Sequence, residues 1–104
     1  MIISKKSNYY LCEVNNNNDF SDLITFLKSL EGDLSVIINL LGFNYNSLDV
    51  YKSLLPFHFI WQKTNKSFIL VSNMIEKDSQ ELIFIKTLEE AIDYFYMEEL
   101  TRNI

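Results

Sequence analysis

Short apolar stretches alternate with amphipathic stretches along the chain, and each pattern predicts a different kind of element. Residues 8–14 are rich in strand-forming side chains, and residues 34–41 and 67–72 are almost continuously apolar, so these segments are predicted strands. Continuously apolar strands are typical of a parallel sheet that is covered on both faces. Residues 82–85 predict a fourth, shorter strand.

The first helix is predicted after a run of asparagines at residues 15–18, which we expect to form a loop. Asp19 is the expected N-cap, because its side chain can accept a hydrogen bond from a free backbone N–H of the first turn. Apolar residues then recur at three- and four-residue spacing up to Leu30, which places them on one face of a helix. Gly32 is the expected end of this helix.

Two further helices are predicted in the second half of the chain. One should begin with Ser47 as its N-cap, carry Leu48 on its apolar face, and kink or restart at Pro56. The other should begin at residues 87–90, where Thr-x-x-Glu forms a capping box. The element order predicts a single α/β domain over residues 1–104, with a four-stranded, mostly parallel sheet and three to four helices.

Composition and charge narrow the classes of function. The formal charge is −5, and no basic stripe is interleaved with aromatic residues, so nucleic acid and anionic membrane surfaces are disfavoured as partners. The single cysteine, Cys12, cannot form an internal disulfide. The sequence shows neither a signal peptide nor an apolar stretch of the ~20 residues that span a bilayer. We therefore expect a cytoplasmic protein without membrane insertion.

Residues that could support catalysis or bind a metal are few. His58 is the single histidine, and with Cys12 as the only other soft ligand it cannot build a zinc site of the usual kind. The sequence has no Gly-x-Ser-x-Gly elbow, and its two glycines cannot form a phosphate-binding loop. We expect no enzyme activity, metal or cofactor. An enzyme would need a closed cleft in which His58 meets two or more acids.

Aromatic residues cluster around the second predicted helix. Aromatic side chains contribute large buried areas to a core, and exposed aromatic patches mark binding surfaces. The sequence leaves open whether this cluster is purely structural or also contacts a partner protein. The candidate interaction surface comprises Tyr45, Tyr51, Phe57, His58, Phe59 and Trp61.

The element order of residues 8–100 resembles the STAS family, the domain shared by sulfate transporters and anti-sigma-factor antagonists. The similarity lies in an apolar strand with an asparagine at residues 36–40, a helix that starts near Ser47, and a second apolar strand at residues 66–72. It continues in the Thr-x-x-Glu-Ala start of the closing helix at residues 87–91. The Met-Glu-Glu-Leu ending at residues 97–100 resembles small stand-alone bacterial members.

The resemblance implies a regulatory domain that acts through protein contacts. In anti-sigma-factor antagonists, a partner kinase phosphorylates a hydroxyl in an Asp-Ser-Ser-Gly-like motif after the central strand. Residues 46–49 stand at this place without a glycine or a second hydroxyl, so Ser47 is the candidate phosphorylation site, with a plain N-cap as its alternative role. The expected partner is a kinase-like or sigma-pathway regulator, or a second copy. The alternative function is a small-molecule or nucleotide-binding sensor with a pocket at the strand ends.

Overall fold

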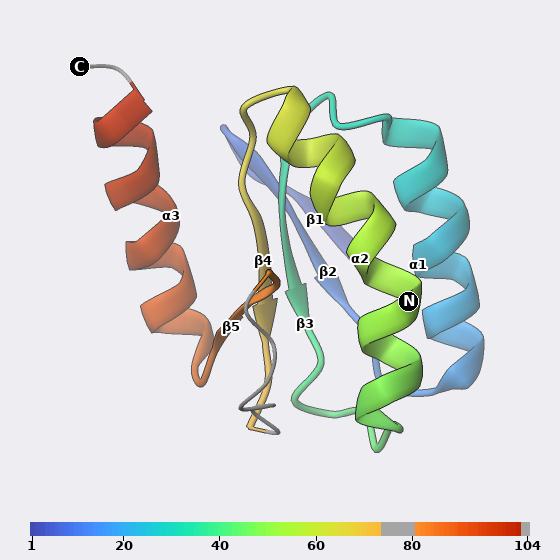
Figure 1. The fold of residues 1–104 in the computed structure, drawn as a ribbon. Helices are drawn as coiled ribbons and strands as arrows, with labels where there is room; N and C mark the ends of the chain where they lie inside the picture. The colour runs from blue at the N-terminus through green and yellow to red at the C-terminus, as the bar shows by residue number, and fades with distance from the viewer. Residues whose placement is uncertain (74–80, 103–104) are drawn as a thin grey trace.

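The computed structural model describes residues 1–73 and 81–102, where three helices pack on a five-stranded sheet (Figure 1). No helix in these ranges is long and apolar enough to cross a membrane. The strands are β1 (Ile2–Lys5), β2 (Tyr9–Glu13), β3 (Ser35–Asn39), β4 (Phe68–Val71) and β5 (Ile83–Ile85). The helices are α1 (Asn17–Leu30), α2 (Ser47–Lys63) and α3 (Leu88–Arg102).

The sheet is mixed, and its strands follow one another in sequence order from β1 to β5. Strands β2 to β5 are parallel neighbours, whereas β1 pairs with β2 in the antiparallel direction. The α/β class is therefore confirmed, but the sheet has five strands and not the four expected. The sequence pattern missed β1, because Ile2–Lys5 is a short edge strand without the continuous apolar character of the covered strands.

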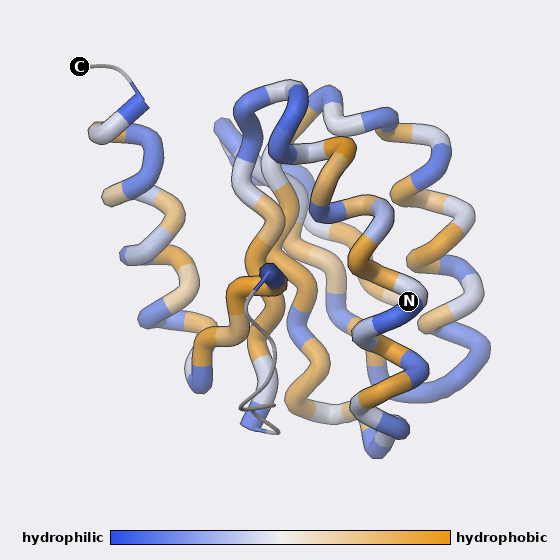
Figure 2. The backbone as a smooth tube through the Cα atoms, in the orientation of Figure 1, coloured by the Kyte–Doolittle hydropathy of each residue, from blue (hydrophilic) through white to orange (hydrophobic). Residues whose placement is uncertain are grey.

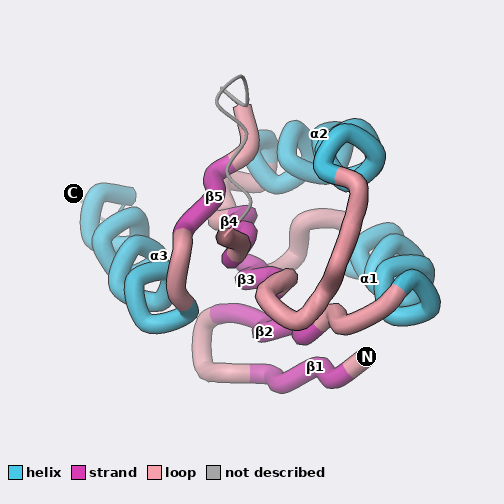
Figure 3. The backbone as a smooth tube through the Cα atoms, turned by 90° about the horizontal axis from the view of Figure 1, so that it is seen from below, coloured by secondary structure: helices cyan, strands magenta, loops and turns pink. Residues whose placement is uncertain are grey.

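The two faces of the sheet are covered unequally. Helices α1 and α2 lie on one face and α3 lies on the other (Figures 1 and 3). Successive side chains of a strand point to opposite faces, so Val36 and Ile38 of β3 join the core under α1 and α2, while Ile37 joins the core under α3. Both faces of β3 and β4 are therefore buried, which explains their continuous apolar sequence.

Each face has its own core. Under α1 and α2, the fully buried side chains include Leu23, Leu54 and Trp61. Under α3, Phe95 packs against Tyr9 of β2, with ring centroids 4.9 Å apart. Figure 2 shows the apolar positions gathered along the strands and on the inner sides of the helices.

Helix α1 begins earlier than predicted. Asn16 is its N-cap, and the Asn16 side-chain Oδ1 accepts a hydrogen bond from the backbone N–H of Asp19 at 2.8 Å. Asp19 thus stands three residues inside the cap, and its Oδ2 accepts from the backbone N–H of Asn15 at 2.9 Å. The prediction that Asp19 caps the helix is wrong, because Asn16 reaches the free N–H groups first. The helix ends at Leu30, before Gly32 with its φ of 74°.

The N-cap of α2 differs from the sequence-based prediction, whereas the N-cap of α3 agrees with it. The N-cap of α2 is Asn46, whose Oδ1 accepts hydrogen bonds from the backbone N–H groups of Leu48 and Asp49. Ser47 is therefore the first helical residue and not the cap. Helix α2 continues through Pro56 as one helix and does not restart there. For α3, Thr87 Oγ1 accepts from the backbone N–H of Glu90 at 3.1 Å, which confirms the predicted threonine cap.

Candidate functional site

The connection between β3 and α2 places Ser47 beyond the carboxyl ends of the parallel strands. Asn39 ends β3, and its side-chain Oδ1 accepts a hydrogen bond from the backbone N–H of Leu41 at 3.0 Å, which turns the chain away from the sheet. The loop then leads to the Asn46 cap and to Ser47 in the first turn of α2, where the Ser47 side chain is partly exposed.

Two leucines beside this connection are exposed. Leu41 follows β3 and is 41% exposed, and Leu48 follows Ser47 and is 58% exposed. The sequence pattern predicted Leu48 on the buried face of the helix, but the buried positions of α2 begin at Val50 and continue through Leu54. Leu48 is therefore free for contact with another molecule. We call Leu41, Ser47 and Leu48 the β3–α2 surface.

Neighbouring loops support this surface from beneath. Gly42 follows Leu41, and a Cβ atom built at Gly42 would lie 2.2 Å from Asn15 Oδ1. The loop after β3 thus packs closely against the loop after β2. Phe43 and Tyr45 are buried in the same connection, with ring centroids 5.4 Å apart. The exposed leucines therefore extend from a well-packed base.

Half of the predicted aromatic surface is core. Tyr45, Phe57 and Trp61 are buried, and the Tyr45 hydroxyl is hydrogen-bonded to Ser72 Oγ. Trp61 is fully buried, and its Nε1 donates to the backbone oxygen of Leu34 at 2.8 Å. These three residues do not form an exposed surface, because they lie on the side of the chain that faces the sheet.

The remaining residues of that predicted surface are spread over α2. Tyr51 and His58 are partly buried, whereas 42% of the surface of Phe59 is exposed. The adjacent Ile60 is exposed as well. The structure thus does not gather the six predicted residues into one patch; it separates a buried side of α2 from an exposed side that Phe59 and Ile60 share.

His58 lines a small cavity at the other end of α2 from Ser47. The cavity has a volume of about 200 Å³, and its wall also includes Lys66, Ser67, Glu98 and Arg102. We call it the His58 cavity. Glu98 is the only acid among the described residues of its wall, so those residues do not provide the two or more acids that an enzyme built around His58 would need.

The other residues with potential reactivity are also placed by the fold. Cys12 lies in β2 with no exposed surface, and burial raises the pKa of its thiol to about 12. Because the thiolate is the reactive form, the Cys12 thiol is unreactive at neutral pH, and Cys12 acts as a packed core residue. Within the described ranges, no group of three or more His, Cys, Asp or Glu side chains could hold a metal ion.

The architecture is of the α/β class: a mixed five-stranded sheet has helices on both faces, and Ser47 lies in the first turn of the helix that follows its middle strand. In comparisons with known proteins, the chain matches no protein-family model and no curated protein.

Proposed function

We propose that this chain is a non-enzymatic regulatory domain that binds a partner protein through the β3–α2 surface, and that phosphorylation of Ser47 switches this contact. The observation that carries the proposal is the position of Ser47, in the first turn of α2 and next to the exposed Leu48, after a connection that also carries the exposed Leu41. The proposal places the protein in the cytoplasm, with a kinase-like or sigma-pathway regulator as its partner.

The order of elements around Ser47 supports a STAS-like assignment. A central parallel strand, β3, leads directly into the helix that carries the serine. The next elements are the buried strand β4, the short strand β5 and the closing helix α3, whose first turn is capped by Thr87. The family resemblance draws on the same order, and in the family this helix start is where the phosphorylated hydroxyl lies.

The physics of the site suits a charge switch. The N-terminus of a helix carries a partial positive charge, so a phosphate on Ser47 would be tolerated by the folded protein. The same phosphate would add nearly two negative charges beside Leu48. An apolar partner surface that covers the leucines would then have to desolvate the phosphate, which weakens binding.

The contact surface can be tested by capture of partners from the native cells. We expect the wild-type chain to retain a partner that Leu48→Asp loses, because the substitution places a charge in the proposed contact. Leu100→Asp is the matched control, since Leu100 is 69% exposed on α3, on the other face of the sheet. Retention of the partner by Leu48→Asp together with its loss from Leu100→Asp would place the contact on α3 and contradict the proposal.

A further inference from the structure

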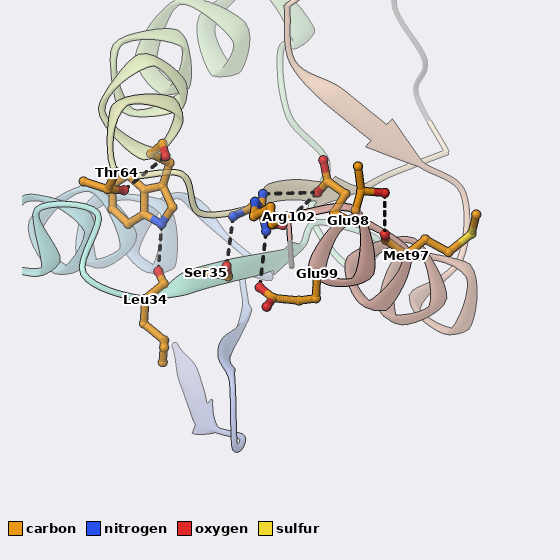
Figure 4. A network of polar contacts seen from close by, with 10 residues as sticks. Leu34, Ser35, Thr64, Met97, Glu98, Glu99 and Arg102 are labelled. Atoms are coloured by element: carbon orange, nitrogen blue, oxygen red, sulfur yellow. Dashed lines mark hydrogen bonds and ion pairs between the residues drawn. The ribbon is translucent and has the colours of Figure 1, made fainter. Parts of the chain in front are cut away.

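The His58 cavity lies at the end of the sheet where β4 begins, among residues from the last turns of α2 and α3. Figure 4 shows the polar contacts at this end of the molecule, made by Glu98, Glu99 and Arg102 of α3 and by Ser35 at the start of β3. Ser67 of the cavity wall is joined to β3, because its backbone N–H donates to the buried Ser35 Oγ at 2.8 Å.

Two basic side chains, Lys66 and Arg102, line the cavity. Lys66 is partly buried in the wall and makes no ion pair with a residue in the described ranges. Arg102 is held in place by α3 itself, with Nη1 at 3.2 Å from Glu99 Oε1. Lys66 is therefore the cationic group in the wall that is available to an incoming carboxylate.

The same wall also holds a carboxylate. Glu98 Oε1 accepts a hydrogen bond from Ser67 Oγ at 2.7 Å and lies 3.9 Å from Arg102 Nη2. Its second oxygen, Oε2, makes no hydrogen bond with a residue that the structure describes. Helices α2 and α3 both end beside the cavity, and a helix C-terminus carries a partial negative charge.

The His58 ring and two apolar side chains complete the wall of the cavity. His58 Nδ1 is buried and has no hydrogen-bond partner within the described part of the chain, which is uncommon because buried polar atoms are almost always paired. Phe68 and Ile83 supply apolar surface to the same wall. The volume of about 200 Å³ is below the range that holds drug-sized ligands, so the occupant must be small.

We infer that the His58 cavity binds a small zwitterion of the α-amino-acid class. Its carboxylate would pair with Lys66, and its ammonium would donate to Glu98 Oε2. An apolar side chain would lie on Phe68 and Ile83. A simple anion fits less well, because Glu98 and the two helix C-termini would repel it.

This site is independent of the proposed protein contact. Helix α2 has 17 residues and carries Ser47 at its first position and Gln62, in the cavity wall, near its last, so these two residues lie about 22 Å apart by the rise of 1.5 Å per residue. Either site could fail its test without affecting the other.

The test uses the single histidine as its own reporter. L-Valine is titrated into the full chain, and the ring nitrogen signals of His58 are followed by NMR. We expect a saturable shift. Isovalerate lacks the ammonium group and isobutylamine lacks the carboxylate. Each should bind at least about tenfold more weakly than L-valine.

Substitutions then assign the binding to the cavity. Lys66→Gln and Glu98→Gln should each weaken L-valine binding by about tenfold, while the exposed controls Lys63→Gln and Glu89→Gln should leave it unchanged. Melting temperatures identify any variant that fails to fold, and the other variant then decides. The inference is overturned by the absence of a saturable shift up to about 10 mM L-valine, by equal binding of isovalerate, or by unchanged binding in both cavity variants.

Discussion

At the scale of single residues, burial decides the reactivity of Cys12. The side chain is fully buried in β2, and the apolar surroundings raise the pKa of the thiol to about 12. Since thiolate is the nucleophile, we expect iodoacetamide to leave Cys12 unmodified in the folded protein at neutral pH and to alkylate it in urea. Mass spectrometry of the intact chain measures this directly. Rapid alkylation without denaturant would contradict the placement of β2 inside the sheet.

Asp19 links the start of the chain to the start of α1. Its Oδ1 lies 2.7 Å from the Met1 ammonium nitrogen, and this contact, together with the hydrogen bond from the Asn15 N–H, lowers the pKa of the Asp19 carboxyl below its ordinary value of 3.8. A carboxyl with a lowered pKa in the folded state stabilises the protein above its ordinary pKa, and the stabilisation is lost as the pH falls through the lowered value.

We therefore expect the free energy of unfolding to fall more steeply below about pH 4 in the wild type than in Asp19→Asn. Urea unfolding at a series of pH values measures the difference. Asp33→Asn is the control, because Asp33 is exposed and makes no ion pair with the described residues. Identical pH profiles for the wild type and Asp19→Asn would show that the ion pair does not stabilise the fold.

At the scale of elements, the cap of α2 separates the structure from the sequence-based prediction. Asn46 supplies the cap and Ser47 does not, so Asn46→Ala should lower the free energy of unfolding by about 1 kcal/mol. Ser47→Ala should change it little. Asn44→Ala is the control for asparagine replacement in the same loop. Denaturant unfolding decides, and a larger loss from Ser47→Ala than from Asn46→Ala would return the cap to Ser47.

Apolar periodicity was enough to predict four strands and three helices, but not the exact start of each helix. Asn, Asp and Ser are nearly equal as N-caps, so the run at residues 15–18 and the Asn46-Ser47 pair each offered several candidates within a few positions. The Thr87 cap was predicted because no other good capping residue stands beside it.

The aromatic residues of α2 show why the candidate site was harder to predict. Phe57 and Phe59 are chemically identical and two positions apart, yet Phe57 is buried and Phe59 is exposed. A helix with apolar residues on most of its sides does not reveal which side faces the sheet. The structure shows which side it is: Trp61 packs against Phe68 of β4, with ring centroids 5.4 Å apart.

At the scale of the whole molecule, the fold depends on two cores, and the one under α3 depends on a single helix. Phe95 fills this core, whereas the adjacent Tyr96 is 44% exposed. Phe95→Ala should lower the free energy of unfolding by about 3–5 kcal/mol, which is a large share of the roughly 5–15 kcal/mol of a typical domain. Tyr96→Ala should have little effect. Equal losses in the two variants, measured by urea unfolding, would contradict the observed packing of α3.

The central claim is that a negative charge at Ser47 controls contact with a partner protein. The most direct measurement is the affinity of the captured partner for Ser47→Asp and for Ser53→Asp, which adds the same charge at an exposed serine further along α2. The account predicts that Ser47→Asp weakens binding by about tenfold or more and that Ser53→Asp binds as the wild type does. Equal affinities for the two variants would contradict it.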